Sequence, residues 1–310
     1  MSSFPKQQIS TIYEQPLIEL IDQARNIHKK YFDNSVELCK LISIKTGGCP
    51  EDCSYCSQSN TNTSDIKINP LLPLVEIEKI IVEAKKNGVK RICMGAAYKT
   101  PNSGALRRVR EYIALIKKYD LESCATLGSL TQEQADELKH AGLDYYNHNI
   151  DTSPEFYPQI ITTRKFQERI DTISHVGNAG IKVCCGGILG LGESHEDRIS
   201  FLHALTELPF SPDSIPINTL VRIPGTKLAS APTLDKLELV RVIATTRILF
   251  PKTKIRLSAG RTELNDSEQL LCFMSGANSI HYGDKLLTTD NNHPNDDQQL
   301  LNKLGIKFNA

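Results

Sequence analysis

Three cysteines lie within eight residues of one another, at Cys49, Cys53 and Cys56. Thiolates are soft ligands that suit iron–sulfur clusters and zinc. Three residues separate the first two cysteines and two separate the last two, which matches neither the paired knuckles of structural zinc sites nor the ferredoxin motifs. On a tight loop made flexible by Gly47 and Gly48, three thiolates can reach three irons of a cubane cluster and leave its fourth iron without a protein ligand. A zinc site that lacks its fourth ligand is the alternative.

Three further cysteines and one arginine fall inside predicted strands that are far apart in the sequence. They are Cys93, Cys124, Cys184 and Arg256. In a barrel, alternate residues of each strand point to the interior, so these four side chains can converge there. Each cysteine taken alone is better explained as a small buried apolar side chain. A buried arginine, however, needs an anionic partner. The combination predicts a second metal-cluster site.

The elements that would position these residues are short apolar strands that alternate with amphipathic helices. We expect strands at 38–45, 90–95, 122–127, 144–150, 181–186, 214–221, 254–259 and 279–282, and helices at 75–87, 103–119, 131–141, 165–179, 195–208, 233–250 and 266–275. Gly142 and Gly180 stand just after two of these helices, where a left-handed residue commonly ends a helix. This alternation implies parallel βαβ units, and eight of them predict an α/β fold, a (β/α)8 TIM-type barrel.

We expect three parts along the chain: an N-terminal helical segment at 1–37, the barrel at 38–285, and a C-terminal tail with a short helix at 286–310. Forty per cent of the 310 residues are hydrophobic, which is enough for a full core. The 36 basic and 36 acidic residues balance, which argues against a protein that grips nucleic acid or an anionic membrane.

The sequence also indicates a cellular compartment. No apolar run approaches the length of a membrane span, and the first residues lack the pattern of a secretory signal. The nine cysteines are an odd number spread over a large chain, which is typical of reduced thiols. We therefore expect a cytoplasmic protein.

With Tyr55 just before its last cysteine, the first motif resembles that of the radical S-adenosylmethionine (radical SAM) enzymes. Over about residues 12–305 the sequence is similar to the biotin synthase family. The stretches that carry this resemblance are Ser43–Cys53, Cys93–Ala97, Tyr145–Tyr157, Val183–Glu193, Arg256–Arg261 and Cys272–Ile280.

The resemblance implies two iron–sulfur clusters. Cys49, Cys53 and Cys56 match the ligands of a 4Fe–4S cluster, which binds S-adenosylmethionine. Cys93, Cys124, Cys184 and Arg256 match the ligands of a 2Fe–2S cluster, which Arg256 would tune. The implied reaction is insertion of sulfur from the 2Fe–2S cluster into dethiobiotin at C9 and C6. This is the last step of biotin biosynthesis.

The resemblance also implies contacts to the cofactor and the substrate. The cofactor contacts are Tyr55, Asn149, Asp151, Arg169 and Ile188, the last from a glycine-rich run whose backbone can approach a flat adenine. The substrate contacts are Asn147, Asn218, Thr288 and Thr289. The implied partners are an electron donor such as flavodoxin or ferredoxin, iron–sulfur assembly proteins and a second copy of the chain in a homodimer.

Two of these assignments have plainer alternatives from the residues alone. Asn147, Asn149 and Asp151 share one strand parity, with His148 on the other, and could form a hydrogen-bonded polar layer at the barrel mouth. Arg169 taken alone would be an exposed helix arginine.

The remaining cysteines have no predicted role. Cys185 should point outward to the helices, and Cys39 and Cys272 are expected to be packed apolar side chains. The competing functions are another radical SAM barrel, such as a carbon-skeleton mutase or a cofactor-maturation enzyme, and a zinc-stabilised binding or scaffold protein.

Overall fold

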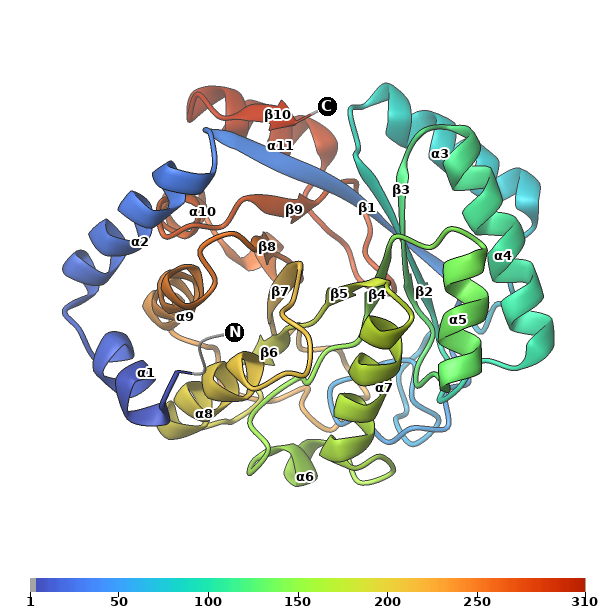
Figure 1. The fold of residues 1–310 in the computed structure, drawn as a ribbon, viewed down its shortest axis with the longest axis horizontal. Helices are drawn as coiled ribbons and strands as arrows, with labels where there is room; N and C mark the ends of the chain where they lie inside the picture. Colours follow the sequence, from blue (N-terminus) through green and yellow to red (C-terminus); the bar gives the residue numbers. More distant parts are fainter. Residues whose placement is uncertain (1–3, 310) are drawn as a thin grey trace.

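The computed structural model describes residues 4–309, and its strands form one sheet that closes on itself (Figure 1). Strands β1, β2, β3, β4, β5, β7, β8 and β9 follow one another in parallel, and β9 pairs with β1 to complete an eight-stranded barrel. Strand β6 pairs with β7, and β10 adds to the start of β1. The strands are β1 (Ser35–Lys45), β2 (Arg91–Ala96), β3 (Glu122–Thr126), β4 (Tyr145–Asn147), β5 (Lys182–Cys184), β6 (Gly187–Leu189), β7 (Ser214–Thr219), β8 (Lys254–Leu257), β9 (Ser279–His281) and β10 (Lys307–Asn309).

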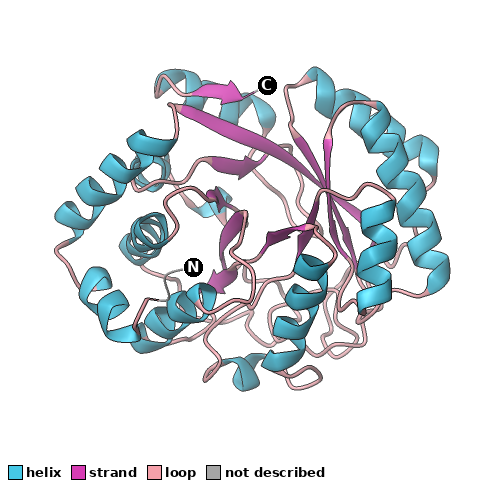
Figure 2. Ribbon diagram, in the orientation of Figure 1, coloured by secondary structure: helices cyan, strands magenta, loops and turns pink. Residues whose placement is uncertain are grey.

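Helices surround the barrel and cover the outer face of the sheet (Figure 2). They are α1 (Lys6–Tyr13), α2 (Leu17–Tyr31), α3 (Leu74–Lys86), α4 (Ser103–Lys118), α5 (Gln132–His140), α6 (Tyr157–Ile160), α7 (Phe166–Asn178), α8 (His195–Thr206), α9 (Lys236–Leu249), the short 3-10 helix η1 (Arg261–Glu263), α10 (Asp266–Met274) and α11 (Pro294–Lys303). Within residues 4–309, none of the helices is long and apolar enough to cross a membrane.

Local sequence explains where several helices begin and end. The side chains of Thr131, Ser194 and Asn265 each accept a hydrogen bond from a backbone N–H of the first turn. In each case the side chain three positions later accepts a hydrogen bond from the backbone N–H of the capping residue. Gly142 and Gly180 follow α5 and α7 with φ of +92° and +73°, as predicted for helix-ending residues. The predicted TIM-type barrel is confirmed.

The leading helical segment consists of two helices that pack on the outside of the barrel beside α8 and α9 (Figure 1). The Tyr13 hydroxyl donates a hydrogen bond to Glu238 on α9 at 2.9 Å. Arg241, also on α9, donates to the backbone carbonyl of Gln15 at 2.8 Å. These contacts attach the N-terminal helices to the barrel wall.

Several observed elements differ from the predicted ones; for example, the strand predicted at 144–150 is the shorter β4, which ends at Asn147. β1 begins at Ser35, three residues before the predicted strand, because its first residues pair with β10. The strand predicted at 181–186 ends at Cys184, and the following glycine-rich run supplies a separate strand, β6. Helix α6 and strand β10 were not predicted, because elements of four and three residues are too short to show periodicity.

A charged cluster fills the barrel at the amino ends of its strands. Arg91 Nη2 lies 2.9 Å from Glu122 Oε2 and 3.4 Å from Glu37 Oε1. The Arg91 guanidinium also stacks on Tyr145, 3.4 Å from the ring centre. Burial would raise the pKa of Glu37, but the positive charges of Arg91 and Arg256 outweigh it and lower the pKa. We call Glu37, Arg91, Glu122 and Tyr145 the barrel floor.

Candidate active site

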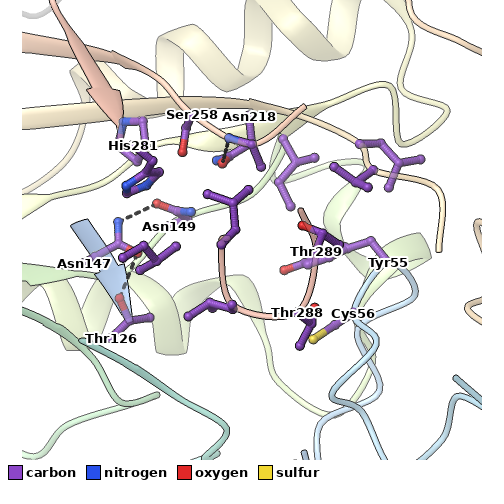
Figure 3. A pocket seen from close by; sticks show the side chains of 18 of the residues that line it. Tyr55, Cys56, Thr126, Asn147, Asn149, Asn218, Ser258, His281, Thr288 and Thr289 are labelled. Carbon is purple, nitrogen blue, oxygen red and sulfur yellow. Dashed lines mark hydrogen bonds between the residues drawn. The ribbon is translucent and has the colours of Figure 1, made fainter. Parts of the chain in front are cut away.

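A cavity of about 280 Å³ opens at the carboxyl ends of the barrel strands, the end at which barrel enzymes carry their active sites. Its lining comes from the loop after β1, from the carboxyl ends of several strands and from the loop after β9 (Figure 3). The predicted site residues that line it are Tyr55, Cys56, Cys93, Cys124, Asn147, Asn149, Asp151, Ile188, Asn218, Arg256, Thr288 and Thr289. Cys49, Cys53, Cys184 and Arg169 are outside this lining.

The loop after β1 carries Cys49, Cys53 and Cys56 and is held in a compact shape by its own hydrogen bonds. The Cys56 N–H donates to the Cys53 carbonyl at 3.1 Å. The side-chain amide of Asn62 donates to the carbonyls of Cys53 at 3.1 Å and Cys56 at 2.7 Å. Gly47 turns the chain with a φ of +73°, which glycine adopts without strain. The three half-buried thiols are therefore presented from one ordered loop.

Two acidic residues between the first two cysteines attach this loop to the segment after α6. Asp52 accepts hydrogen bonds from the N–H groups of Thr162 at 2.9 Å and Thr163 at 3.1 Å, and from both of their hydroxyls. Burial would raise the pKa of Asp52, but these hydrogen bonds outweigh it and lower the pKa. Glu51 accepts from the Thr163 hydroxyl at 2.6 Å and lies 3.4 Å from Arg164.

The chemistry of the first cysteine set fits an iron–sulfur cluster. Burial raises the pKa of the three thiols, to about 11 for Cys56, so they are neutral until a metal displaces their protons. Among residues 4–309, no three His, Cys, Asp or Glu side chains form a site for one metal ion. In a cubane cluster each thiolate binds its own iron, so its ligands need not meet at one point. The loop offers three such ligands, with Cys56 facing the cavity.

The second predicted set lies inside the barrel, at the inner end of the cavity. Cys93 and Cys124 are paired in register on β2 and β3 and pack together, and Cys184 is close enough to Cys124 for each thiol to shift the pKa of the other. Arg256 lines the cavity from β8 with 2% of its surface exposed, and the three cysteines are each at most 5% exposed. The hydrogen bond from Cys124 outweighs burial and, with the charge of Arg256, lowers the pKa of Cys184 to about 6. Thiols beside a buried cation fit a second cluster.

Cys39 also belongs to this inner group. Its Sγ lies 2.9 Å from Arg256 Nη2, and its side chain packs with Cys93. Cys39 is fully buried and packs in an apolar cluster, as predicted. The prediction missed its polar partners, which Cys39 meets inside the barrel because it has the inward parity of β1. The predictions for the other two unassigned cysteines are confirmed: Cys185 and Cys272 are buried in the main apolar core outside the cavity.

The polar stretch that begins at Asn147, the last residue of β4, follows the predicted parity. Asn147, Asn149 and Asp151 line the cavity, whereas His148 is buried outside the lining. The Asn147 amide donates to Asn149 Oδ1 at 2.9 Å and to Cys184 Sγ at 3.4 Å (Figure 3 shows the first of these bonds). Asn147 therefore connects the polar stretch to the inner cysteines.

The side chain of Arg169 on α7 contacts this polar stretch from outside the cavity lining. Its Nη2 lies 2.8 Å from Asp151 Oδ2, its Nε donates to the Tyr157 hydroxyl at 2.9 Å, and its Nη1 donates to the Asn149 carbonyl at 3.1 Å. The Tyr55 hydroxyl donates to the same Asp151 oxygen at 2.8 Å. Arg169 is buried, so the alternative of an exposed helix arginine is wrong.

The predicted substrate contacts approach the cavity from two further elements. Asn218 on β7 is held by its amide, which donates to the Gly187 carbonyl at 2.9 Å. The loop after β9 places Thr288 and Thr289 beside Tyr55 and Cys56 (Figure 3). The Thr288 hydroxyl also hydrogen-bonds with a serine hydroxyl of the cysteine loop at 2.8 Å.

The sequence prediction missed His281, at the end of β9. This residue lines the cavity, and its enclosed Nδ1 has no hydrogen-bond partner within residues 4–309. Burial and the charge of Arg256 lower the pKa of His281 to about 3, so the imidazole is neutral. Strand alternation could have indicated His281, because it is two residues from Ser279 on β9 and therefore points to the same, inward face. Other lining residues that the prediction missed include Leu41, Thr126, Ser258, Leu286 and Leu287.

Two family models together cover the predicted residues of the site. The Radical SAM superfamily matches residues 43–205, which contain the first cysteine set. The Biotin and Thiamin Synthesis associated domain matches residues 216–307, which contain Arg256 and the loop after β9.

Full-length relatives are more specific. The chain is 56% identical over 307 residues to biotin synthase of Francisella tularensis, with 98% of each chain covered. It is 53% identical over 299 residues to biotin synthase of Legionella pneumophila, with 96% of this chain and 95% of the relative covered. The crystal structure of methylornithine synthase shares the fold, with a TM-score of 0.83 and 21% identity over 98% of this chain and 93% of that one. The chain therefore belongs to the biotin synthase family of radical SAM enzymes.

Proposed function

We propose that this protein inserts sulfur into dethiobiotin at C9 and C6, forming biotin in the last step of its biosynthesis. One observation carries the proposal: Cys93, Cys124 and Arg256 line the cavity that Cys56 faces, and Cys184 lies beside Cys124 just behind the lining. A radical SAM enzyme that does not insert sulfur has no need of this inner site. When bound, a 4Fe–4S cluster with S-adenosylmethionine supplies a 5′-deoxyadenosyl radical, and a 2Fe–2S cluster, consumed as a substrate, supplies the sulfur.

Cys49, Cys53 and Cys56 would hold the 4Fe–4S cluster. Their thiols must lose protons to bind iron, and burial, which raises their pKa values, makes this loss depend on the metal. The hydrogen bonds of Asp52 and Glu51 keep the loop in one position while ligands enter and leave. An electron donor such as flavodoxin or ferredoxin would reduce this cluster.

The polar stretch would hold S-adenosylmethionine. Asn149 and Asp151 offer an amide and a carboxylate that can bond to ribose hydroxyls. Arg169 lies outside the lining and each of its nitrogens already bonds to the protein, so it would bind the methionyl carboxylate through the second hydrogen on Nη1 or Nη2. Tyr55 and Ile188 also line the cavity and would enclose the cofactor.

The remaining polar residues would orient dethiobiotin between the two clusters. Asn147 and Asn218 carry both donors and acceptors, which complement the N–H and C=O groups of a ureido ring. Thr288 and Thr289 would bond to the substrate carboxylate through their hydroxyls or backbone N–H groups. Apolar side chains also line the cavity and would help to exclude water from a site in which a radical forms; they include Leu41, Pro216, Leu220, Leu286 and Leu287.

Mössbauer spectroscopy of protein reconstituted anaerobically with iron-57 and sulfide tests the proposal. The wild type is expected to give one 4Fe–4S and one 2Fe–2S signal, and Cys124→Ala to lose the second signal alone. Cys272→Ala is the matched control, because Cys272 is an equally buried cysteine of the apolar core. A single 4Fe–4S signal that Cys124→Ala leaves unchanged would contradict the proposal and leave a radical SAM enzyme of another kind.

A further inference from the structure

The inner site contains a fourth thiol. Cys39 projects from β1 into the same group as Cys93 and Cys124, and it is fully buried. β1 is the neighbour of β2 on one side and of β9 on the other, so Cys39 stands between the strand of Cys93 and the next strand after Arg256. Four thiols on four barrel strands are one more than the resemblance assigns to the 2Fe–2S cluster.

Arg256 is held in place from one side. Its Nε donates to Ser279 Oγ at 3.1 Å, and its Nη2 donates to Cys39 Sγ at 2.9 Å and lies 3.7 Å from Glu37 Oε1. Within residues 4–309, its Nη1 makes no hydrogen bond, and the side chain lines the cavity. Nη1 is therefore the nitrogen available to a ligand in the cavity, and Cys39 is the group directly behind the guanidinium.

We propose that Cys39 is a further ligand of the inner cluster, able to take the position of Arg256 on iron. This inference rests on the proposed function. While the guanidinium is in place, Cys39 is its hydrogen-bond acceptor. When the guanidinium is absent or displaced, the Cys39 sulfur binds the iron, and the cluster then has four cysteine ligands.

The exchange balances without an oxidant or reductant. An arginine nitrogen would bind iron as the neutral guanidine, so on its release the guanidine would take up the proton of the Cys39 thiol, whose sulfur lies 2.9 Å from Arg256 Nη2. The Cys39 thiolate would then replace that nitrogen on iron. No electron is transferred. A thiolate in place of the arginine nitrogen makes the cluster more negative, which lowers its reduction potential.

Three variants reconstituted with iron-57 and sulfide test this inference: Arg256→Met, Arg256→Met with Cys39→Ser, and Arg256→Met with Cys272→Ser. If Cys39 binds, both irons of the 2Fe–2S cluster in Arg256→Met have the same donors, two cysteine sulfurs and two sulfides, and give one Mössbauer doublet. The variant with Cys39→Ser is expected to give two unequal doublets or to lose the cluster. The variant with Cys272→Ser should behave like Arg256→Met. The 4Fe–4S signal shows that each variant is folded.

Three results would overturn the inference. The first is an identical 2Fe–2S spectrum in Arg256→Met with and without Cys39→Ser. The second is a nitrogen coupling that pulsed electron paramagnetic resonance detects in Arg256→Met and that disappears when His281→Leu is added. The imidazole of His281, and not Cys39, would then be the replacement ligand. The third is a wild type that holds no 2Fe–2S cluster at all, which would overturn the proposed function first. The first two leave the proposed function intact.

Discussion

Arg169 and Asp151 form a buried ion pair beside the mouth of the cavity, with 2.8 Å between Nη2 and Oδ2. Asp151 has a φ of +67°, a left-handed conformation that costs about 1–3 kcal/mol in a residue other than glycine. Its backbone is held there by a hydrogen bond of 2.8 Å from the Ile188 N–H to its carbonyl. The surrounding structure therefore maintains the carboxylate in its position before any ligand is bound.

Removal of one partner of this pair should destabilise the protein. Arg169→Met leaves a buried carboxylate without its cation, for which we expect a loss of about 3–5 kcal/mol in the free energy of unfolding. Urea denaturation of Arg169→Met, Asp151→Asn and the double variant measures the coupling between them. We expect the double variant to lose less than the sum of the two single losses. Additive losses would show that the pair contributes no coupling.

Asn147 is predicted to act on both the substrate and the inner cluster. In Asn147→Ala the hydrogen bond to the Cys184 sulfur is lost, so the reduction potential of the 2Fe–2S cluster should fall. Loss of one hydrogen bond to dethiobiotin should also raise its KM about tenfold. Redox titration and steady-state kinetics check the two effects separately. Asn178→Ala, at the exposed end of α7, is the control and should change neither value.

Asp52 should make stability depend on pH in the acidic range. Its folded-state pKa is lowered, so the ionised carboxylate stabilises the fold at neutral pH, and this contribution is lost as the pH falls through about 4 toward the folded-state pKa. Asp52→Asn should reduce the free energy of unfolding by about 1–3 kcal/mol at pH 7, and the difference from the wild type should shrink as the pH approaches 3. Urea denaturation of cluster-free protein across this range measures it.

The control for this experiment is Asp65→Asn, which changes an exposed carboxylate in the loop that follows the cysteine motif. It should leave stability within about 0.5 kcal/mol of the wild type at every pH. A difference between Asp52→Asn and the wild type that stays constant between pH 7 and pH 3 would contradict the role of the Asp52 charge.

Gly186 should not tolerate a larger side chain. A Cβ atom at this position would lie 2.0 Å from the backbone oxygen of Pro216, so the connection between β5 and β6 would have to move away from β7. We expect Gly186→Ala to lower the melting temperature by more than about 5 °C, which corresponds to a loss of more than about 2 kcal/mol in a chain of this size. Gly104→Ala, near the start of α4, is the control: its Cβ would have room, and alanine favours a helix by about 0.5–1 kcal/mol. Equal melting temperatures for the two variants would contradict the packing argument.

The sequence by itself was sufficient for the elements with strong local patterns. The barrel was predictable because strands and helices alternate along the chain, and each of these carries its own periodicity. Strand alternation also predicted that Asn147, Asn149 and Asp151 share one face. They do so although β4 ends at Asn147 and Asp151 is left-handed. The first cysteine set needs no tertiary structure to be recognised, because its ligands are neighbours on one loop.

Only the tertiary structure decided which distant side chains meet. Arg169 looked like a surface residue from its helix, but the packing of α7 against the barrel mouth buries it against Asp151. Cys39 looked like a packed apolar residue, but closure of the barrel brings β1 beside β9 and places its sulfur on Arg256. Local periodicity gives the face on which a side chain lies. The partner that it meets there depends on barrel closure and strand register, which are set by contacts between residues far apart in the chain.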